Sequence, residues 1–283
     1  LDPQGNATTG CGVVKREALP TVYQILIGRS TLVDARIKTE FGFDILPANR
    51  ELAGAEVELI EMGGREFRLR DALAPVLGDY DFILMDCPPA LNMLTVNGLV
   101  AAEAVMIPMQ CEYYALEGLT DLVATLKKVR ANLNSRLEIE GLLRTLFDPR
   151  STLTQQVSAE LDEHFGRKVY RTIIPRNVRL AEAPSYGKPV IAFDRSSKGA
   201  QAYMALAQEM LDRRDGVRAL DGPLDEFGHT RRRRITGVGD AQRGRPPPRA
   251  WFTMRCRFVE VWRCAAAQTH DACGQRRIGG MKR

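Results

Sequence analysis

Residues 79–89 read Asp-Tyr-Asp-Phe-Ile-Leu-Met-Asp-Cys-Pro-Pro, in which four consecutive apolar residues are followed by Asp86. Such a run predicts a buried strand. An aspartate at the end of a parallel strand lies at the carboxyl edge of the sheet, where open α/β folds bind ligands. A carboxylate in this position can hold Mg²⁺ next to bound phosphates, usually through a water molecule. Ordinary strand ends also carry aspartates, so the segment alone leaves both interpretations open.

A second polar segment is LDPQGNATTG at residues 1–10. Asp2 precedes a proline and is followed closely by glycine and asparagine, a combination typical of a turn. On its own this pattern fits an ordinary loop as well as a functional one. The six cysteines contain no CxxC pair, and their spacing favours neither a zinc site nor a disulfide framework.

The elements that would position these segments follow from the pattern between residues 43 and 198, where short apolar runs alternate with longer helical stretches. This alternation is typical of a parallel sheet covered by helices on both faces. We therefore predict an α/β fold with a doubly wound, mostly parallel sheet. The predicted strands are 43–46, 82–85, 105–108, 141–147 and 169–174, and the predicted helices are 52–60, 69–77, 91–101, 118–133, 152–165 and 200–211.

The composition changes near Asp212. Residues 1–211 hold 23 Lys and Arg against 27 Asp and Glu, whereas residues 212–283, called the tail below, hold 17 against 8. The tail includes four consecutive arginines at 231–234 and an isolated apolar patch at 258–262, without sustained periodicity. We predict one α/β domain at 1–211 and a basic, disordered tail that does not pack on it. The chain has no membrane-span pattern and no signal-peptide pattern at its start, which predicts a cytoplasmic protein.

The two polar segments belong to a set of five strings that resembles the ParA/Soj family of partitioning ATPases, in family order over residues 1–211. The strings are LDPQGNATTG, DILPANRELAGAEVEL, DFILMDCPPALNML, PMQCEYYALEGL and IPRNVRLAEAPSYGKPV, followed by a matching helix at 197–211. The resemblance implies a P-loop NTPase fold that binds ATP and Mg²⁺. It assigns Asp2 to the positioning of the attacking water and Asp86 to the Mg²⁺ shell, and it places Pro175 and Asn177 beside the adenine.

The resemblance also implies partners. Members of this family bind DNA without regard to sequence, as ATP-bound homodimers, and act with a ParB-type protein bound to a centromere-like site. Arg150 and Arg179 match arginines of the family's DNA-facing surface. Charge alone would make this region an ordinary solvated face, because residues 144–198 hold ten basic and six acidic residues. With the resemblance, phosphate binding becomes the better interpretation, and a nucleoid-associated location follows.

The family's phosphate loop, KGGVGKT, has no counterpart in this sequence, which contains no G-x-x-x-x-G-K-[ST] string. We expect a chain truncated before the switch aspartate, without the first strand and the phosphate loop, that does not hydrolyse ATP by itself. Two alternatives remain open. One is a membrane-associated ATPase similar to MinD, although no amphipathic anchor follows residues 200–211. The other is a non-enzymatic remnant of a partitioning protein.

Overall fold

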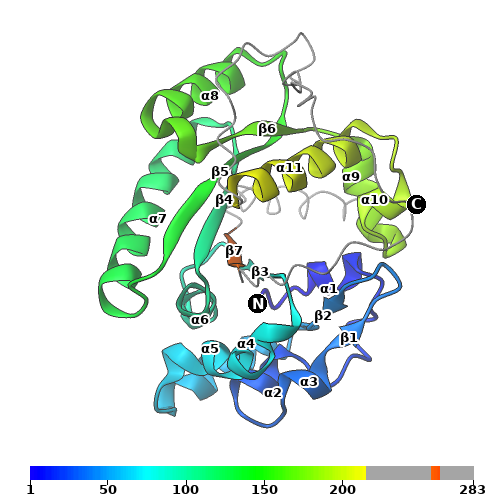
Figure 1. The fold of residues 1–283 in the computed structure, drawn as a ribbon, viewed down its shortest axis with the longest axis vertical. Helices are drawn as coiled ribbons and strands as arrows, with labels where there is room; N and C mark the ends of the chain where they lie inside the picture. Colours follow the sequence, from blue (N-terminus) through cyan, green and yellow to red (C-terminus); the bar gives the residue numbers. More distant parts are fainter. Residues whose placement is uncertain (215–255, 262–283) are drawn as a thin grey trace, which may run out of the picture.

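Five parallel strands form the central sheet, and the computed structural model describes residues 1–214 and 256–261 of the chain (Figure 1). The order across the sheet is β3-β7-β4-β5-β6. Every ladder in this sheet is parallel. The strands are β3 (Phe82–Cys87), β4 (Ala104–Gln110), β5 (Glu138–Phe147), β6 (Val169–Pro175) and β7 (Cys256–Val261).

Helices connect the consecutive strands β3 to β6. Helix α6 (Met93–Ala101) joins β3 to β4, α7 (Tyr113–Asn132) joins β4 to β5, and α8 (Thr152–Phe165) joins β5 to β6. Polar residues start two of these helices: the side chains of Asn92 and Ser151 accept hydrogen bonds from the backbone N–H groups of Thr95 and Thr154. The predicted α/β fold with a parallel sheet and helices is therefore confirmed, and the helix predicted at 152–165 has the observed bounds.

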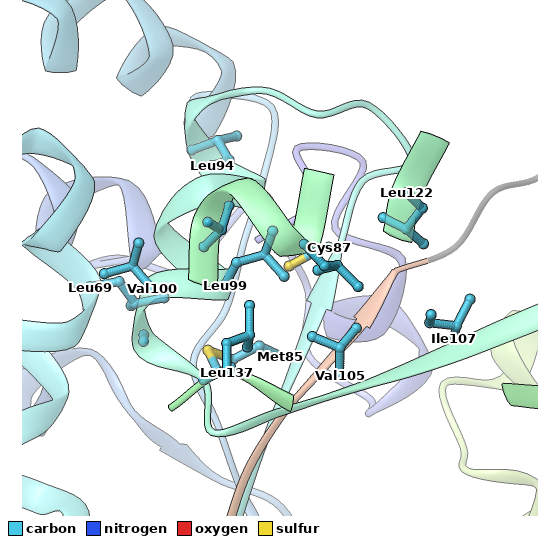
Figure 2. Packing of buried hydrophobic residues seen from close by; sticks show 14 of the residues in the cluster. Leu69, Met85, Cys87, Leu94, Leu99, Val100, Val105, Ile107, Leu122 and Leu137 are labelled. Carbon is cyan, nitrogen blue, oxygen red and sulfur yellow. The ribbon is translucent and has the colours of Figure 1, made fainter. Parts of the chain in front are cut away.

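Alternate side chains of the strands enter two separate cores, one on each face of the sheet. The larger core joins β3, β4 and β5 to helices α6, α7 and α8. Figure 2 shows part of this core, with the labelled side chains Leu69, Met85, Cys87, Leu94, Leu99, Val100, Val105, Ile107, Leu122 and Leu137. On the other face, α11 (Lys198–Arg214) packs Leu206 against Met106, Leu143 and Tyr170 of β4, β5 and β6.

The N-terminal part surrounds the β3 side of the sheet with short helices (Figure 1). These are α1 (Asn6–Gly10), α2 (Val22–Leu26), α3 (Leu32–Ala35), α4 (Leu52–Glu58) and α5 (Arg68–Leu73), with the 3-10 turns η1 (Leu59–Glu61), η2 (Arg65–Phe67) and η3 (Ala74–Asp79). The helices predicted at 52–60 and 69–77 are thus each completed by a 3-10 turn. The strand predicted at 43–46 is wrong as part of the main sheet. Its residues Asp44–Ile45 form β2, which pairs antiparallel with β1 (Ile37–Lys38) in a separate hairpin.

The C-terminal part of the domain passes through η4 (Gly166–Lys168), α9 (Val178–Glu182), η5 (Ala183–Tyr186) and α10 (Val190–Phe193) before it reaches α11. Helix α11 is fixed to β6 by Glu209, whose buried carboxylate accepts hydrogen bonds from the backbone N–H groups of Arg171 at 3.0 Å and Thr172 at 2.9 Å. Across residues 1–214 and 256–261, no helix is both long enough and apolar enough to cross a membrane.

The predicted boundary of the tail needs two corrections. Helix α11 extends to Arg214, three residues past the predicted end of the domain. The prediction that the tail does not pack on the domain is wrong for Cys256–Val261, which lie inside the sheet as β7. This segment includes most of the isolated apolar patch at 258–262. The apolar run in the patch is too short to predict a strand from the sequence. The four arginines at 231–234 lie outside the described residues.

Candidate functional site

Asp86 is the second-last residue of β3 and therefore lies at the carboxyl edge of the parallel sheet, as its sequence context predicted. The amino group of Leu1 donates a hydrogen bond of 2.7 Å to the backbone oxygen of Asp86, so the start of the chain lies against this strand end. Burial raises the pKa of the Asp86 carboxyl, the positive amino group opposes this rise, and the nearby charge of Asp2 adds to it. The structure thus brings Asp2 and Asp86 to one place.

The conformation of the loop that carries Asp2 is fixed by local hydrogen bonds. The Asp2 carboxylate accepts from the backbone N–H of Gln4 at 2.9 Å, and the Asp2 backbone oxygen accepts from the N–H of Gly5 at 2.9 Å. This is the turn that the Asp-Pro pattern predicted. Lys15 donates from Nζ to the backbone oxygen of Gln4 at 2.7 Å. The carboxylate is therefore held by backbone on one oxygen and remains partly exposed to solvent.

Gly5 and Thr8 attach this loop to the rest of the domain. Gly5 has φ +62°, and a Cβ atom there would lie 2.3 Å from the backbone oxygen of Ala48, so only glycine fits. The buried hydroxyl of Thr8 donates to the same oxygen at 3.2 Å and accepts from the Ala48 N–H at 2.9 Å. The Asp2 loop consequently has a fixed position over the edge of the sheet.

Two glycines bring the Asp2 loop against the segment that follows β6. Gly12 has φ +80° and Gly187 has φ +62°, and a Cβ atom on Gly187 would lie 3.2 Å from the Cα atom of Gly12. This close approach connects the start of the chain to the turn after η5. Figure 1 shows α1 beside α9 and α10 on one side of the molecule. The glycines allow the two backbones to pass without side chains between them.

Pro175 and Asn177 lie where β6 ends. Pro175 is the last residue of the strand, and the Asn177 side-chain oxygen accepts a hydrogen bond from the backbone N–H of Arg179 at 3.0 Å, which starts α9. Strand β6 is four places from β3 in the sheet, roughly 19 Å at the usual strand spacing. The structure therefore does not place Asn177 directly against Asp86. Asn177 is connected to the Asp86 region indirectly, because the chain after Asn177 passes through η5 and approaches the segment that follows the Asp2 loop at Gly12 and Gly187.

Arg150 follows β5 in the loop before α8, and its side chain is 87% exposed. Its guanidinium donates two hydrogen bonds to the Asp148 carboxylate, at 3.0 and 2.9 Å. These hydrogen bonds hold the pKa of Asp148 at about 2. The pair is therefore fully ionised at neutral pH, and part of the positive charge of Arg150 is balanced locally.

Arg179 is the second residue of α9, the short helix that follows β6. Its guanidinium contacts two carboxylates, Glu182 at 2.8 Å and Asp194 at 3.3 Å. Hydrogen bonding from Ser196 lowers the pKa of Asp194, and the charge of Arg179 lowers it further. Both carboxylates are partly exposed, so the arginine remains open to solvent on one side.

The two arginines belong to one edge, because β5 and β6 are adjacent and Phe147 pairs with Pro175 at their carboxyl ends. The Arg176 N–H also donates to the Phe147 backbone oxygen at 3.1 Å. The exposed basic residues on the loops and helices beyond these two strands are Arg150, Arg176, Arg179, Lys188, Arg195 and Lys198. Three carboxylates, those of Asp148, Glu182 and Asp194, contact Arg150 and Arg179, so the six basic residues outnumber these acidic partners. We call these six residues the basic edge.

Sequence reasoning missed the contacts that fix the site. Asp148 and Asp194 gave no signal as ion partners, and nothing in the sequence points to Ala48 as the anchor for Thr8. The glycines of the Asp2 loop were recognisable as turn residues, but the approach of Gly12 to Gly187 joins positions far apart in the chain. Within residues 1–214 and 256–261, no group of three or more His, Cys, Asp or Glu side chains could hold a metal ion by itself.

Comparison with known proteins finds one matching family model and several relatives with similar sequences. A family model described as an AAA domain matches residues 1–139. An uncharacterized protein of Pseudomonas putida is 59% identical over 75% of this chain and 81% of its own length. The chromosome partitioning protein ParA of Caulobacter vibrioides is 50% identical, over 75% of this chain and 80% of its own. The sporulation initiation inhibitor protein Soj of Bacillus subtilis is 49% identical, over 74% and 83%.

The fold is also similar to that of solved structures. The cobyrinic acid a,c-diamide synthase of Mycobacterium smegmatis, with bound ADP and magnesium, has a TM-score of 0.66 and 35% sequence identity. The match covers 77% of this chain and 81% of that protein. The fold similarity therefore covers about three quarters of this chain.

Proposed function

Because this chain belongs to the ParA/Soj family of partitioning ATPases, we propose that it serves in the partitioning of a chromosome or plasmid. In this proposal a nucleotide-bound homodimer binds DNA without regard to sequence and acts with a ParB-type partner in the cytoplasm, on the nucleoid. The observation that carries the proposal is the meeting of Asp2 and Asp86 at the carboxyl edge of β3, in a chain whose relatives include ParA and Soj.

The residues at this edge fit Mg²⁺ that arrives with a nucleotide. Asp86 offers hard carboxylate oxygens, and Mg²⁺ usually binds one or two carboxylates together with substrate phosphates. When bound, Mg²⁺ and ATP supply the phosphoryl chemistry, in which the metal neutralises charge on the phosphates. Asp86 would hold the metal, usually through water.

Asp2 has the place and the chemistry to orient a water molecule. Its backbone is fixed by Gly5 and its carboxylate by the Gln4 N–H, so the free oxygen has a defined direction. A fixed acceptor beside a reacting phosphate lowers the barrier mainly by positioning. Pro175 and Asn177 would border the adenine through the segment that returns to the Asp2 loop.

The chain as given should not hydrolyse ATP alone. No G-x-x-x-x-G-K-[ST] string occurs in it, so the backbone amides and the lysine that hold phosphates in this class are not supplied by its sequence. We propose that turnover requires a phosphate loop joined to this domain. ATP hydrolysis by the unaltered chain, measured as phosphate release, would contradict this part of the proposal.

The role of Asp2 can be tested in a version extended at its N-terminus by a strand, the loop KGGVGKT and the residues that lead into Leu1. In this version Asp2→Ala should keep ATP affinity and reduce turnover by at least about 100-fold, the usual contribution of a positioned proton acceptor. Asp81→Ala is the matched control, because Asp81 is an exposed aspartate just before β3. If Asp2→Ala lost ATP affinity instead, its assignment to the water would be wrong.

A further inference from the structure

Leu146, near the carboxyl end of β5, has a left-handed backbone conformation. Its φ is +48°, and within residues 1–214 it is the one residue other than glycine with a positive φ. This region is unfavourable for a bulky L-residue, because the Cβ atom comes too close to the following carbonyl oxygen. Burial does not compensate for it, since 37% of Leu146 is exposed. Such conformations persist where the surrounding structure imposes them, and they concentrate at functional sites.

The pairing of β5 with β6 shows what this conformation does. Arg144 pairs with Ile173. The next pair along the ladder joins Phe147 to Pro175, so β5 advances by three residues where β6 advances by two. Leu146 therefore lies in a β-bulge with one extra residue in β5, a feature that is rare between parallel strands. A left-handed residue in a bulge is usually glycine.

The extra residue changes the face to which the end of β5 presents its side chains. Alternate residues of a strand point to opposite faces, so two residues three positions apart should point to different ones. Arg144 points toward α8, where its guanidinium donates to the Asp162 carboxylate, and Phe147 packs against the same larger core. The bulge thus returns the chain to this face just before the loop that carries Arg150.

Hydrogen bonds hold the loop after the bulge in one conformation. The backbone oxygen of Asp148 accepts from the Ser151 N–H at 3.1 Å. The backbone oxygen of Pro149 accepts from the side chain of Gln155 at 2.6 Å. These contacts tie the loop to the start of α8. They over-determine the backbone beside Leu146, which allows the strain there to persist.

The loop places one carboxylate near two arginines. Asp148 accepts two hydrogen bonds from Arg150, which lower its pKa, and the charge of Arg176, which follows β6, lowers this pKa further. Guanidinium groups from neighbouring strand ends that gather around one anion are typical of phosphate binding. Arg150 is thus oriented for an anion before any ligand binds.

We propose that Leu146 is a positioning residue for this loop. Its left-handed backbone adds the extra residue to β5 that directs Arg150 to the side of Arg176, where the two arginines meet phosphate groups of a nucleic acid backbone. That the ligand is a nucleic acid rests on the proposed function, whereas the orientation of the loop does not. The strain preorganises Arg150, because a side chain fixed beforehand loses less freedom on binding. The backbone of Leu146 carries this role, so glycine should serve in its place.

Urea unfolding of the full chain tests the strain. Leu146→Gly and Leu146→Ala both truncate the leucine and differ mainly in their tolerance of a positive φ. The glycine variant should therefore have the higher urea midpoint, by roughly 0.3 to 1 M. Leu153 is the matched control, because it is 44% exposed and lies in α8. There the order should be reversed, with Leu153→Ala the more stable. An equal or lower midpoint for Leu146→Gly than for Leu146→Ala would refute the strain.

Carbon NMR of the Asp148 carboxyl group in the full chain tests the positioning. Deleting Leu146 removes the extra residue, and Leu146→Pro excludes a positive φ, whereas Leu146→Gly is the control that keeps it. In either of the first two variants, once circular dichroism shows it to be folded, the Asp148 pKa should rise from about 2 by at least about 1 unit toward the ordinary value for aspartate. If neither folds, Leu146→Val, which disfavours a positive φ, should show a smaller rise. An unchanged Asp148 pKa in the folded variant would overturn the proposal.

Binding to random duplex DNA, in the version with a phosphate loop and with ATP, separates this proposal from the proposed function. The variant without the bulge should flatten the salt slope by about 1 to 2 units, since two copies of Arg150 in a dimer contribute about 0.9 each. It should have no further effect in an Arg150→Ala background, because it acts through that arginine. If Arg150→Ala itself left DNA binding unchanged, the proposed DNA-binding face would be wrong, and the Asp148 titration would still decide the role of Leu146. An additional loss in the Arg150→Ala background would refute positioning through Arg150.

Discussion

Replacing Arg150 and Arg179 together by glutamate should weaken binding to duplex DNA of random sequence and make the remaining binding less sensitive to salt. The test uses the version with a phosphate loop, in the presence of ATP. The four arginines at 231–234 are changed to serine, so that they cannot substitute. The rest of the tail is kept, because removing it would also remove β7.

The magnitude follows from the basic edge. A homodimer presents two copies of Arg150 and Arg179, and each phosphate neutralised contributes about 0.9 to the slope of log affinity against log salt. Four contacts would contribute roughly 3.6. Both arginines already contact carboxylates, Arg150 at 2.9 Å from Asp148 and Arg179 at 2.8 Å from Glu182, which reduces the effect. We expect the slope to flatten by about 2 to 3 units, which corresponds to a roughly 16- to 64-fold smaller loss of affinity for a fourfold rise in salt.

Fluorescence anisotropy at several salt concentrations measures both quantities. Arg130→Glu is the matched control, because Arg130 is exposed on α7 and away from the basic edge. A second variant, Asp148→Asn, removes the carboxylate that balances Arg150 and should leave DNA affinity equal or higher. Undiminished affinity and an unchanged slope in Arg150→Glu/Arg179→Glu would refute the reasoning and move the DNA-binding face elsewhere.

Two further predictions concern stability, measured by urea unfolding of the full chain. Glu209→Ala should lower the free energy of unfolding by roughly 2–4 kcal/mol, because it leaves two backbone N–H groups of β6 and the Arg213 guanidinium without their acceptor. Burial alone would raise the pKa of Glu209, but these donors lower it. The ionised carboxylate therefore contributes to the free energy of unfolding above about pH 4.3, and this contribution is lost as the pH falls further. If the stability difference between the wild type and Glu209→Ala did not shrink in acid, this reasoning would be wrong. Gly5→Ala should destabilise by at least about 1–2 kcal/mol, from its φ of +62° and its contact with the Ala48 oxygen, whereas Gly10→Ala, with open space at its Cβ position, should be neutral or stabilising.

The sequence by itself determined the elements whose signals are local. The apolar run at 82–85 and the following Asp86 gave β3 and its carboxylate end, and the periodicity at 152–165 gave α8 with its observed bounds. The spacing of the strands and helices also gave the class of fold, because successive βα units leave few other arrangements. The Asp-Pro-Gln-Gly pattern predicted the turn that holds Asp2.

Only the tertiary structure decided the contacts between distant parts of the chain. The two-residue strand at Asp44–Ile45 belongs to a separate hairpin and not to the main sheet. The apolar pattern at 43–46 fits a strand in either place. Arg150 and Arg179 gained acidic partners from nearby turns whose geometry the sequence does not specify. The pairing of Cys256–Val261 with β3 and β4 is made by backbone groups that every sequence shares, so the residue types of this segment do not reveal it.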